Sequence, residues 1–171
     1  MGQRVHDKAD HYIQHGNRKK LKLRLKKHPD LCDSNDATLI FTAIWHNRGM
    51  VKWLLEKGVS ANTQMGEGGN TPLMEAAAAG DVPLVELLLE FKADPNALNE
   101  DNENPLGFAV TWQQPEIVKI LVAAGADVNN TDDSGDGKTQ LDWAELSGWT
   151  TVVDALISVG AKRYVQLYPN A

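Results

Sequence analysis

Apolar residues in this chain recur in paired helical blocks that alternate with short polar segments. In one block, Leu73, Ala76 and Ala77 have i, i+3, i+4 spacing, which predicts a helix with a small-residue face. The Gly-Asp pair at 80–81 can end that helix and cap the next one. The second helix, over 84–89, carries more apolar surface than one helix pair can bury. Each pair is therefore expected to pack against the next pair.

The block repeats at a nearly constant period. Its copies begin at Thr38, Thr71, Asn104 and Thr139, which are 33, 33 and 35 residues apart. A glycine or lysine closes the second helix of each copy at an equivalent position; these residues are Gly58, Lys92, Gly125 and Gly160. A period of this length predicts a solenoid of stacked helical units.

Specific motifs accompany the period. Thr71-Pro72-Leu73 opens the second copy, Gly80 ends its first helix, and "LLLEFKADPN" closes it; "GADVN" over 125–129 closes the next copy. In these residues the chain resembles the ankyrin repeat family, over about Asp33 to Lys162 with a degenerate unit before it. The resemblance implies an all-α ankyrin-repeat solenoid of about five units including degenerate caps. Each unit would be a β-turn finger followed by two antiparallel helices.

The resemblance also implies the domain organisation. We expect a single ankyrin repeat domain over 1–171, with a degenerate basic N-terminal capping unit at its start and a short tail at its end. The boundaries are 1–32 for the capping unit, 33–65, 66–98 and 99–131 for the repeats, 132–162 for the C-terminal repeat or cap, and 163–171 for the tail. In the last helix, a polar stripe of Thr150, Asp154 and Ser158 suits an outer face, with Val152, Val153, Leu156 and Ile157 facing inward.

Charge is distributed unevenly. Residues 1–32 carry a formal net charge of +6 and residues 33–171 carry −12. The stretch "RKKLKLRLKKH" alternates like a strand, but it is rich in Lys and Leu and lacks β-branched residues, so we predict a helix. Leu21 and Leu25 would face the stack and Leu23 would be partly exposed. Trp53, in an apolar second helix, is predicted to lie in the core.

The basic helix from Arg18 to Lys27 allows an alternative function, binding of nucleic acid or an anionic surface. It lacks interleaved aromatic residues and any known DNA-reading motif. A solvated outer face of a capping helix is the preferred interpretation.

The segment "DSGDGKTQLDWA" resembles phosphate-binding and calcium-binding loops. A Walker loop would need a glycine at Asp132, and a calcium loop would need a glutamate at Trp143, so neither motif is complete. We interpret the segment as a polar finger with Thr139 as the cap of the following helix. It is two residues longer than its neighbours.

Candidate chemistry is sparse. Cys32 is the single cysteine, and His11 and His15 are spaced i, i+4 but make at most two metal ligands. We expect no enzyme activity, cofactor, metal or small-molecule substrate. No apolar run is long enough for a membrane helix, and the N-terminal residues do not form a secretory signal, so we expect a cytoplasmic protein without membrane contact.

The expected function is therefore protein–protein interaction. In the family, partners contact the finger tips and the two positions before the glycine that ends the first helix. Carried over by position, the predicted contact residues are Trp45, His46, Ala78, Ala79, Thr111 and Trp112 on first helices, and Asp101, Glu103, Asp136 and Lys138 on fingers. Trp45 and Trp112 would be anchors on a concave face, and the acidic fingers favour a partner with a basic surface. Trp143 and Trp149 are predicted to be packing or rim residues. Asn104 for Thr and Gln113 for Gly depart from the family pattern.

Overall fold

The structure is a computed structural model that describes residues 3–32, 37–66, 68–131 and 138–169. It divides into two compact units, Met1–Pro72 and Leu73–Ala171, here termed unit 1 and unit 2. Over the described residues the regular elements are helices, and extended pairing is confined to two isolated bridges, Met65 with Asn70 and Thr131 with Thr139. The prediction of an all-α repeat fold is confirmed. The expectation that 1–171 acts as a single domain stays a prediction.

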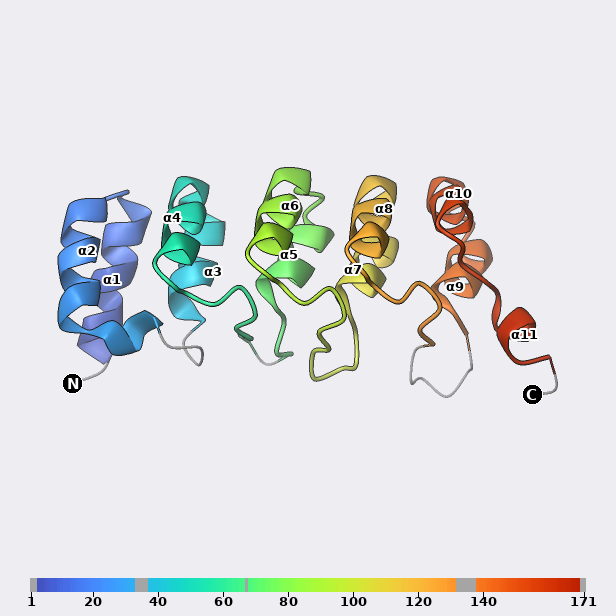
Figure 1. Cartoon of the computed structure of the whole chain (residues 1–171), viewed down its shortest axis with the longest axis horizontal. Helices are drawn as coiled ribbons and strands as arrows, with labels where there is room; N and C mark the ends of the chain where they lie inside the picture. Colours follow the sequence, from blue (N-terminus) through green and yellow to red (C-terminus); the bar gives the residue numbers. More distant parts are fainter. Residues whose placement is uncertain (1–2, 33–36, 67, 132–137, 170–171) are drawn as a thin grey trace. The chain divides into compact units, whose positions relative to one another are not determined.

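Unit 1 contains two helix pairs (Figure 1). Its elements are α1 (Gln3–Gln14), α2 (Arg18–Lys27), the 3₁₀ turn η1 (Pro29–Cys32), α3 (Thr38–His46), the 3₁₀ turn η2 (Arg48–Met50) and α4 (Val51–Glu56). Helix α1 packs against α2 and α3, and α3 packs against α4. Polar contacts join the pairs: Thr42 Oγ1 donates to Asp10 Oδ1 at 3.1 Å, Asn47 Nδ2 donates to the Ile13 carbonyl at 3.0 Å, and Arg18 donates to the Gly49 carbonyl at 2.7 Å.

The basic stretch forms helix α2, as predicted. Asn17 caps its N-terminus by accepting a hydrogen bond from Lys20 N at 3.1 Å. Leu21 and Leu25 are buried and Leu23 is exposed, so one face of α2 packs on the unit while the lysines point to solvent. The alternating pattern did not produce a strand because burial follows the i, i+4 pair rather than every second residue.

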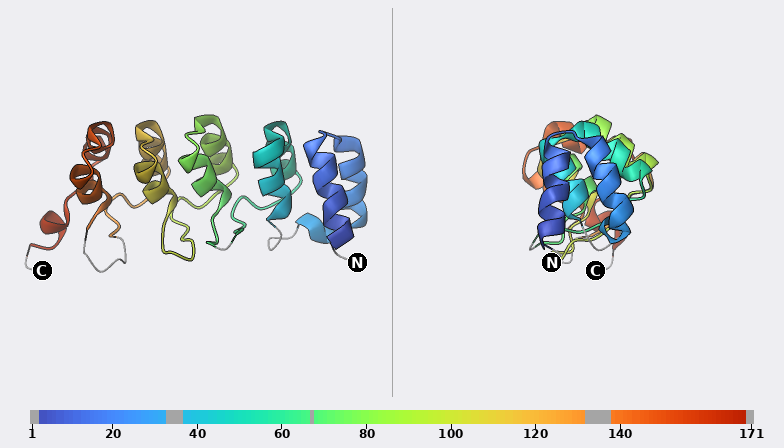
Figure 2. Two further views of the ribbon diagram at one scale, coloured as in Figure 1. Left: turned by 180° about the vertical axis from the view of Figure 1, so that it is seen from behind. Right: turned by 90° about the vertical axis from the view of Figure 1, so that its left-hand side faces the viewer.

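Unit 2 contains three helix pairs and a short terminal helix. Its elements are α5 (Pro72–Ala78), α6 (Val82–Glu90), α7 (Pro105–Thr111), α8 (Pro115–Ala123), α9 (Gln140–Leu146), α10 (Thr150–Ser158) and α11 (Tyr164–Leu167). The second helices α6, α8 and α10 pack side by side in one row, and α7 packs beside α9 in another (Figures 1 and 2). The loop before α7 extends away from the row of second helices (Figure 1).

Side chains cap the N-termini of α6 and α7 in unit 2, and the cap at Asp81 was predicted. Asp81 caps α6 by accepting from Leu84 N at 3.3 Å, and Asn104 caps α7 by accepting from Gly107 N at 2.8 Å. The turn between α5 and α6 needs a left-handed residue, and Gly80 supplies it with φ +69°. The equivalent Gln113 adopts φ +54°, so the repeat geometry is kept although the glycine is absent.

Asparagine side chains bridge consecutive repeats in unit 2. Asn96 Nδ2 donates to the Gly125 carbonyl, and Asn96 Oδ1 accepts from Asp127 N, both at 2.9 Å. One period later, Asn129 Oδ1 accepts from Lys162 N at 2.8 Å. These contacts give the asparagine of the closing motif a structural role, because it satisfies backbone groups of the next repeat that no helix satisfies.

The outer helix of unit 2 differs from its prediction at one residue. Thr150, Asp154 and Ser158 are exposed as predicted, and Val152 and Leu156 are buried. Ile157 was expected to face inward but is exposed, because Val152, Ala155 and Leu156 form the buried face of α10 and the next residue lies about 100° further around the helix. Helix α11 ends at Leu167, two residues before Pro169, because proline cannot continue a helix.

Candidate protein-interaction surface

The loop before α7 is an ordered finger organised by Asn99, whose side chain is only 7% exposed. Asn99 Oδ1 accepts from Asp101 N at 3.0 Å and from Glu103 N at 2.8 Å. Asn99 N also donates to the Glu103 carbonyl at 3.0 Å, and Asn102 takes a left-handed conformation with φ +59°. Because one buried amide holds both ends of the turn, the acidic side chains of the finger project from a fixed backbone.

A cavity of about 380 Å³ lies between this finger, α7 and α9 of unit 2. The finger contributes acidic and amide side chains, α7 contributes one side of its first-helix surface, and α9 contributes polar and aromatic side chains. Residues that line the cavity include Asp101, Glu103, Val110, Thr111, Asn130, Gln140, Trp143, Ser147 and Trp149. Three residues predicted from the sequence, Asp101, Glu103 and Thr111, are therefore brought together.

Charge in this cavity has one sign. Asp101 and Glu103 are the charged residues among those that line it, and both are exposed. Glu103 Oε2 accepts a hydrogen bond from Asn99 Nδ2 at 3.2 Å, whereas the Asp101 carboxylate forms no hydrogen bond or ion pair with another described residue. The cavity therefore presents acceptors for a cation.

Two aromatic residues of the cavity were missed by the sequence analysis. Trp143 and Trp149 are half-buried and line it together with the finger, rather than serving only as packing or rim residues. A weak signal was available, because Gln140, Trp143 and Ser147 share one face of α9 at i, i+3, i+7. The Nζ of Lys138 lies 4.8 Å from the centre of the Trp143 ring, which is a cation–π distance.

Trp112 is a large, exposed apolar side chain on the first-helix side of unit 2. It follows α7 directly and is 60% exposed, next in sequence to Thr111 of the cavity. Ala79 is exposed and Ala78 is half-buried at the end of α5. Tryptophan is enriched among residues that dominate binding at interfaces, so the exposed indole makes this surface a candidate interface.

Other predicted contact residues lie elsewhere. Trp45 and His46 end α3 in unit 1, where both are exposed; Trp45 is 54% exposed and packs edge to face on Phe41 with ring centres 5.5 Å apart. Asp136 falls outside the described residues, as do most of the positions weighed for a Walker or calcium loop. The predicted first-helix and finger positions are thus exposed or half-buried wherever the structure describes them.

Unit 1 has a smaller cavity beside the basic helix. It measures about 270 Å³ and is lined by Lys22, Lys26, Lys57 and Trp53 with two apolar residues. The prediction that Trp53 is a core residue is wrong: its ring is half-buried, with Lys57 Nζ 5.9 Å from its centre. The sequence could not show the partial exposure of Trp53, because that exposure depends on how α2 and α4 lie beside the cavity that Trp53 lines.

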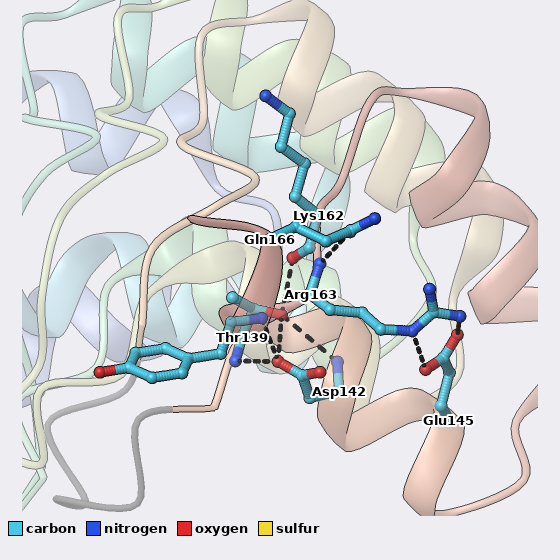
Figure 3. A network of polar contacts seen from close by, with 7 residues as sticks. Thr139, Asp142, Glu145, Lys162, Arg163 and Gln166 are labelled. Carbon is cyan, nitrogen blue, oxygen red and sulfur yellow. Dashed lines mark hydrogen bonds and ion pairs between the residues drawn. The ribbon is translucent and has the colours of Figure 1, made fainter. Parts of the chain in front are cut away.

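The C-terminal segment is tied to α9 by a polar network (Figure 3). Thr139 caps α9 as predicted and forms a capping box with Asp142. Its hydroxyl lies 2.9 Å from the Lys162 carbonyl, and Asp142 Oδ2 accepts from Tyr164 N at 2.8 Å. Arg163 pairs with both carboxylate oxygens of Glu145. The Thr139 hydroxyl therefore has hydrogen-bond partners within the protein, namely Asp142 and the Lys162 carbonyl.

Partial burial acts to raise the pKa of Asp142, but hydrogen bonds from the Thr139 and Tyr164 amides and the Thr139 hydroxyl, with the nearby Arg163 charge, hold it below its ordinary value. A carboxylate with a lowered folded-state pKa stabilises the fold above its unfolded-state pKa of about 4. That stabilisation is lost as the pH falls through the lower folded-state pKa.

We therefore expect the Asp142→Asn variant to be less stable than the natural protein at neutral pH. The difference in the free energy of unfolding should be constant from about pH 7 to 5 and should shrink below about pH 4, as urea titrations at stepped pH would measure. Asp154→Asn, a matched change on the exposed stripe of α10, is the control. A difference that persists unchanged into strong acid would contradict the assignment.

The described ranges contain no group of three or more His, Cys, Asp or Glu residues arranged to hold a metal ion. Nor does any helix there have the length and apolar character needed to cross a membrane.

Comparisons with known proteins agree with the repeat geometry. A sequence profile of ankyrin repeats in three copies matches residues 43–132 and 73–166. Alpha-latrocrustotoxin-Lt1a of Latrodectus tredecimguttatus is 32% identical over 108 residues, which are 60% of this chain and 8% of that protein. The E3 ubiquitin-protein ligase KEG of Arabidopsis thaliana is 35% identical over 89 residues, 52% of this chain and 6% of that protein.

A shorter relative is human protein phosphatase 1 regulatory subunit 27, 35% identical over 81 residues, which are 46% of this chain and 53% of that protein. The chain thus spans a small part of the two long relatives and about half of the short one. Ankyrin repeats are generally protein–protein interaction modules and are typically non-catalytic. The helix pairs, the bridging asparagines and the profile match together show that the chain belongs to the ankyrin repeat family.

Proposed function

We propose that this chain binds a partner protein through the finger and first-helix side of unit 2. Trp112 would be the anchor, and Asp101 and Glu103 would orient a partner with a basic surface. The proposed contact surface also includes Ala78, Ala79, Thr111 and Lys138. The single observation that supports the proposal most is the 60% exposure of Trp112, since a solvated indole is costly unless a partner covers it.

Unit 1 would contribute a second contact through Trp45 and His46. Both residues are exposed at the end of α3, and the edge-to-face contact with Phe41 limits how far the Trp45 ring can rotate. A side chain that is held in place before binding loses less conformational entropy on binding. Binding would need no catalysis and no cofactor, and we place it in the cytoplasm, in accordance with the single cysteine.

Neither the matched family nor the relatives named above supports the alternative of nucleic-acid or anionic-surface binding through Arg18 to Lys27. The acidic finger residues Asp101 and Glu103 would repel a polyanion. Protein binding is therefore the function that we retain.

We expect Trp112→Ala to weaken partner binding by about 2 kcal/mol, or roughly 30-fold, because the variant removes the largest exposed apolar group of the surface. Thermal stability should be nearly unchanged, since the indole packs on little of its own unit. The measurement is affinity capture from native lysate, followed by titration of the captured protein against both forms.

The control is Ile157→Ala, which removes another exposed apolar side chain, from the second-helix row. It should leave capture intact. Equal capture by the natural protein and Trp112→Ala would overturn the proposed surface, and equal loss with Ile157→Ala would mean that capture depends on nonspecific apolar contact.

A further inference from the structure

We infer that the cavity between the finger, α7 and α9 of unit 2 holds an arginine side chain of the partner protein. This inference rests on the proposed function, and it assigns a chemical class to the residue that enters the cavity. Its basis is a combination of groups that matches a guanidinium: two carboxylates, Asp101 and Glu103, and two indoles, Trp143 and Trp149, all lining one cavity.

The charge of the cavity selects a cation. Its charged lining residues are both acidic, so they repel an anionic side chain and attract a cation more strongly than a neutral hydrogen-bond donor. Asp101 has acceptor capacity that no described residue uses, and Glu103 Oε1 is not engaged in the contact that Oε2 makes with Asn99 Nδ2. Exposed carboxylates attract weakly through water, so they contribute selectivity and association rate more than affinity.

The indoles supply the rest of the interaction. A guanidinium is planar, weakly hydrated and stacks on aromatic faces, whereas an ammonium is a compact, strongly hydrated point charge. Lys138 Nζ already lies 4.8 Å from the centre of the Trp143 ring, so this ring attracts a cation, and an entering guanidinium would compete with Lys138 for that face. Only arginine combines this stacking with a fork of N–H donors that can reach two carboxylates and a side-chain amide oxygen.

Size and rigidity are consistent with one side chain. The volume of about 380 Å³ is at the small end of the roughly 300–1,000 Å³ found for ligand pockets. It accommodates a long side chain with a short piece of flanking backbone rather than a helix or a strand. The finger is held by Asn99, so the carboxylates need little rearrangement on binding.

The test uses the full chain and a defined probe. N-acetyl-arginine amide is titrated into the ¹⁵N-labelled protein, and the indole N–H resonances are followed; N-acetyl-citrulline amide, its neutral isostere, and N-acetyl-lysine amide are matched probes. Trp→Phe variants assign the five indole resonances. We expect saturable shifts at Trp143 and Trp149 with arginine. The citrulline probe should bind at least about fivefold more weakly, and lysine should lie between them.

Variants tie the shifts to this cavity. The double variant Asp101→Asn/Glu103→Gln should lower arginine affinity at least about fivefold. Glu86→Gln/Glu90→Gln, which removes the same charge from exposed positions of α6, should lower it much less. Trp112→Ala should leave the arginine titration unchanged, because Trp112 does not line the cavity.

The outcomes separate this inference from the proposed function. The arginine site would be overturned by equal binding of the arginine and citrulline probes, or by the absence of a saturable shift with any probe. It would also be overturned by shifts confined to indoles outside the cavity, or by equal effects of the two charge variants. Partner capture that depends on Trp112 would still stand in those cases. Conversely, the probe titration could show arginine-specific shifts while Trp112→Ala captures the partner as well as the natural protein does. That result would keep the arginine site and overturn the role of Trp112 as the anchor.

Discussion

Replacing Leu121 by alanine is expected to lower the free energy of unfolding by about 3 kcal/mol, within the roughly 2–5 kcal/mol range for buried leucines. Leu121 lies on α8, the second helix of the middle pair in unit 2, and its side chain is 0% exposed. Helix α8 packs against α6, α7 and α10. The lost methyl groups would therefore weaken packing with both neighbouring repeats, not only within one pair.

Leu146→Ala makes the same chemical change at a side chain that is 68% exposed on α9, and it should cost no more than about 0.5 kcal/mol. Urea unfolding measures both values, and hydrogen exchange shows where protection is lost. For Leu121→Ala, protection should fall in α6 and α10 as well as in α8. A cost below about 1 kcal/mol, or loss of protection in α8 alone, would contradict the stacked arrangement.

Replacing Asn99 by alanine is expected to cost about 2–3 kcal/mol and to loosen the finger before α7. The substitution leaves the Asp101 and Glu103 amides without their acceptor and removes the donor to Glu103 Oε2. Each such bond contributes about 0.5–1.5 kcal/mol, and orphaned amides add their desolvation cost. The finger should then show faster amide exchange at Asp101 and Glu103, and the arginine probe should bind more weakly although no lining residue has changed.

Asn99→Asp is the matched variant. It keeps the oxygen that accepts from the two amides but loses the amide donor and adds a carboxylate beside Glu103, so its cost should be intermediate. A finger whose exchange rates do not change in Asn99→Ala would show that the turn is held by other contacts. The assignment of Asn99 as the organising residue would then be wrong.

The basic helix and two of the helix caps were predictable from the sequence. Alternation suggested a strand over residues 18–27, but composition predicted the helix that forms, with Leu21 and Leu25 buried. Asp81 and Thr139 were recognisable as caps because capping depends on a side chain and an amide about three residues apart. Local chemistry of this kind can be read from a single chain.

Side-chain burial at the edges of the packing was less predictable. Trp53 and Ile157 sit among apolar neighbours in sequence, yet Trp53 is half-buried and Ile157 is exposed. Periodicity defines a helix face only to within the width of one side chain. Whether a residue at the border of that face is covered depends on where the neighbouring helix ends.

By itself, the sequence determined the helix pairs, their period, their caps and the family, because these depend on spacing within one repeat. It also predicted Asp101, Glu103 and Thr111 as contact residues, which stays a prediction. Only the tertiary structure decided that Trp143 and Trp149 join them around one cavity and that Trp112 stands exposed beside it. The reason is physical: these groups come from consecutive repeats, and their proximity is created by the packing of α7 on α9 and by the turn that Asn99 holds.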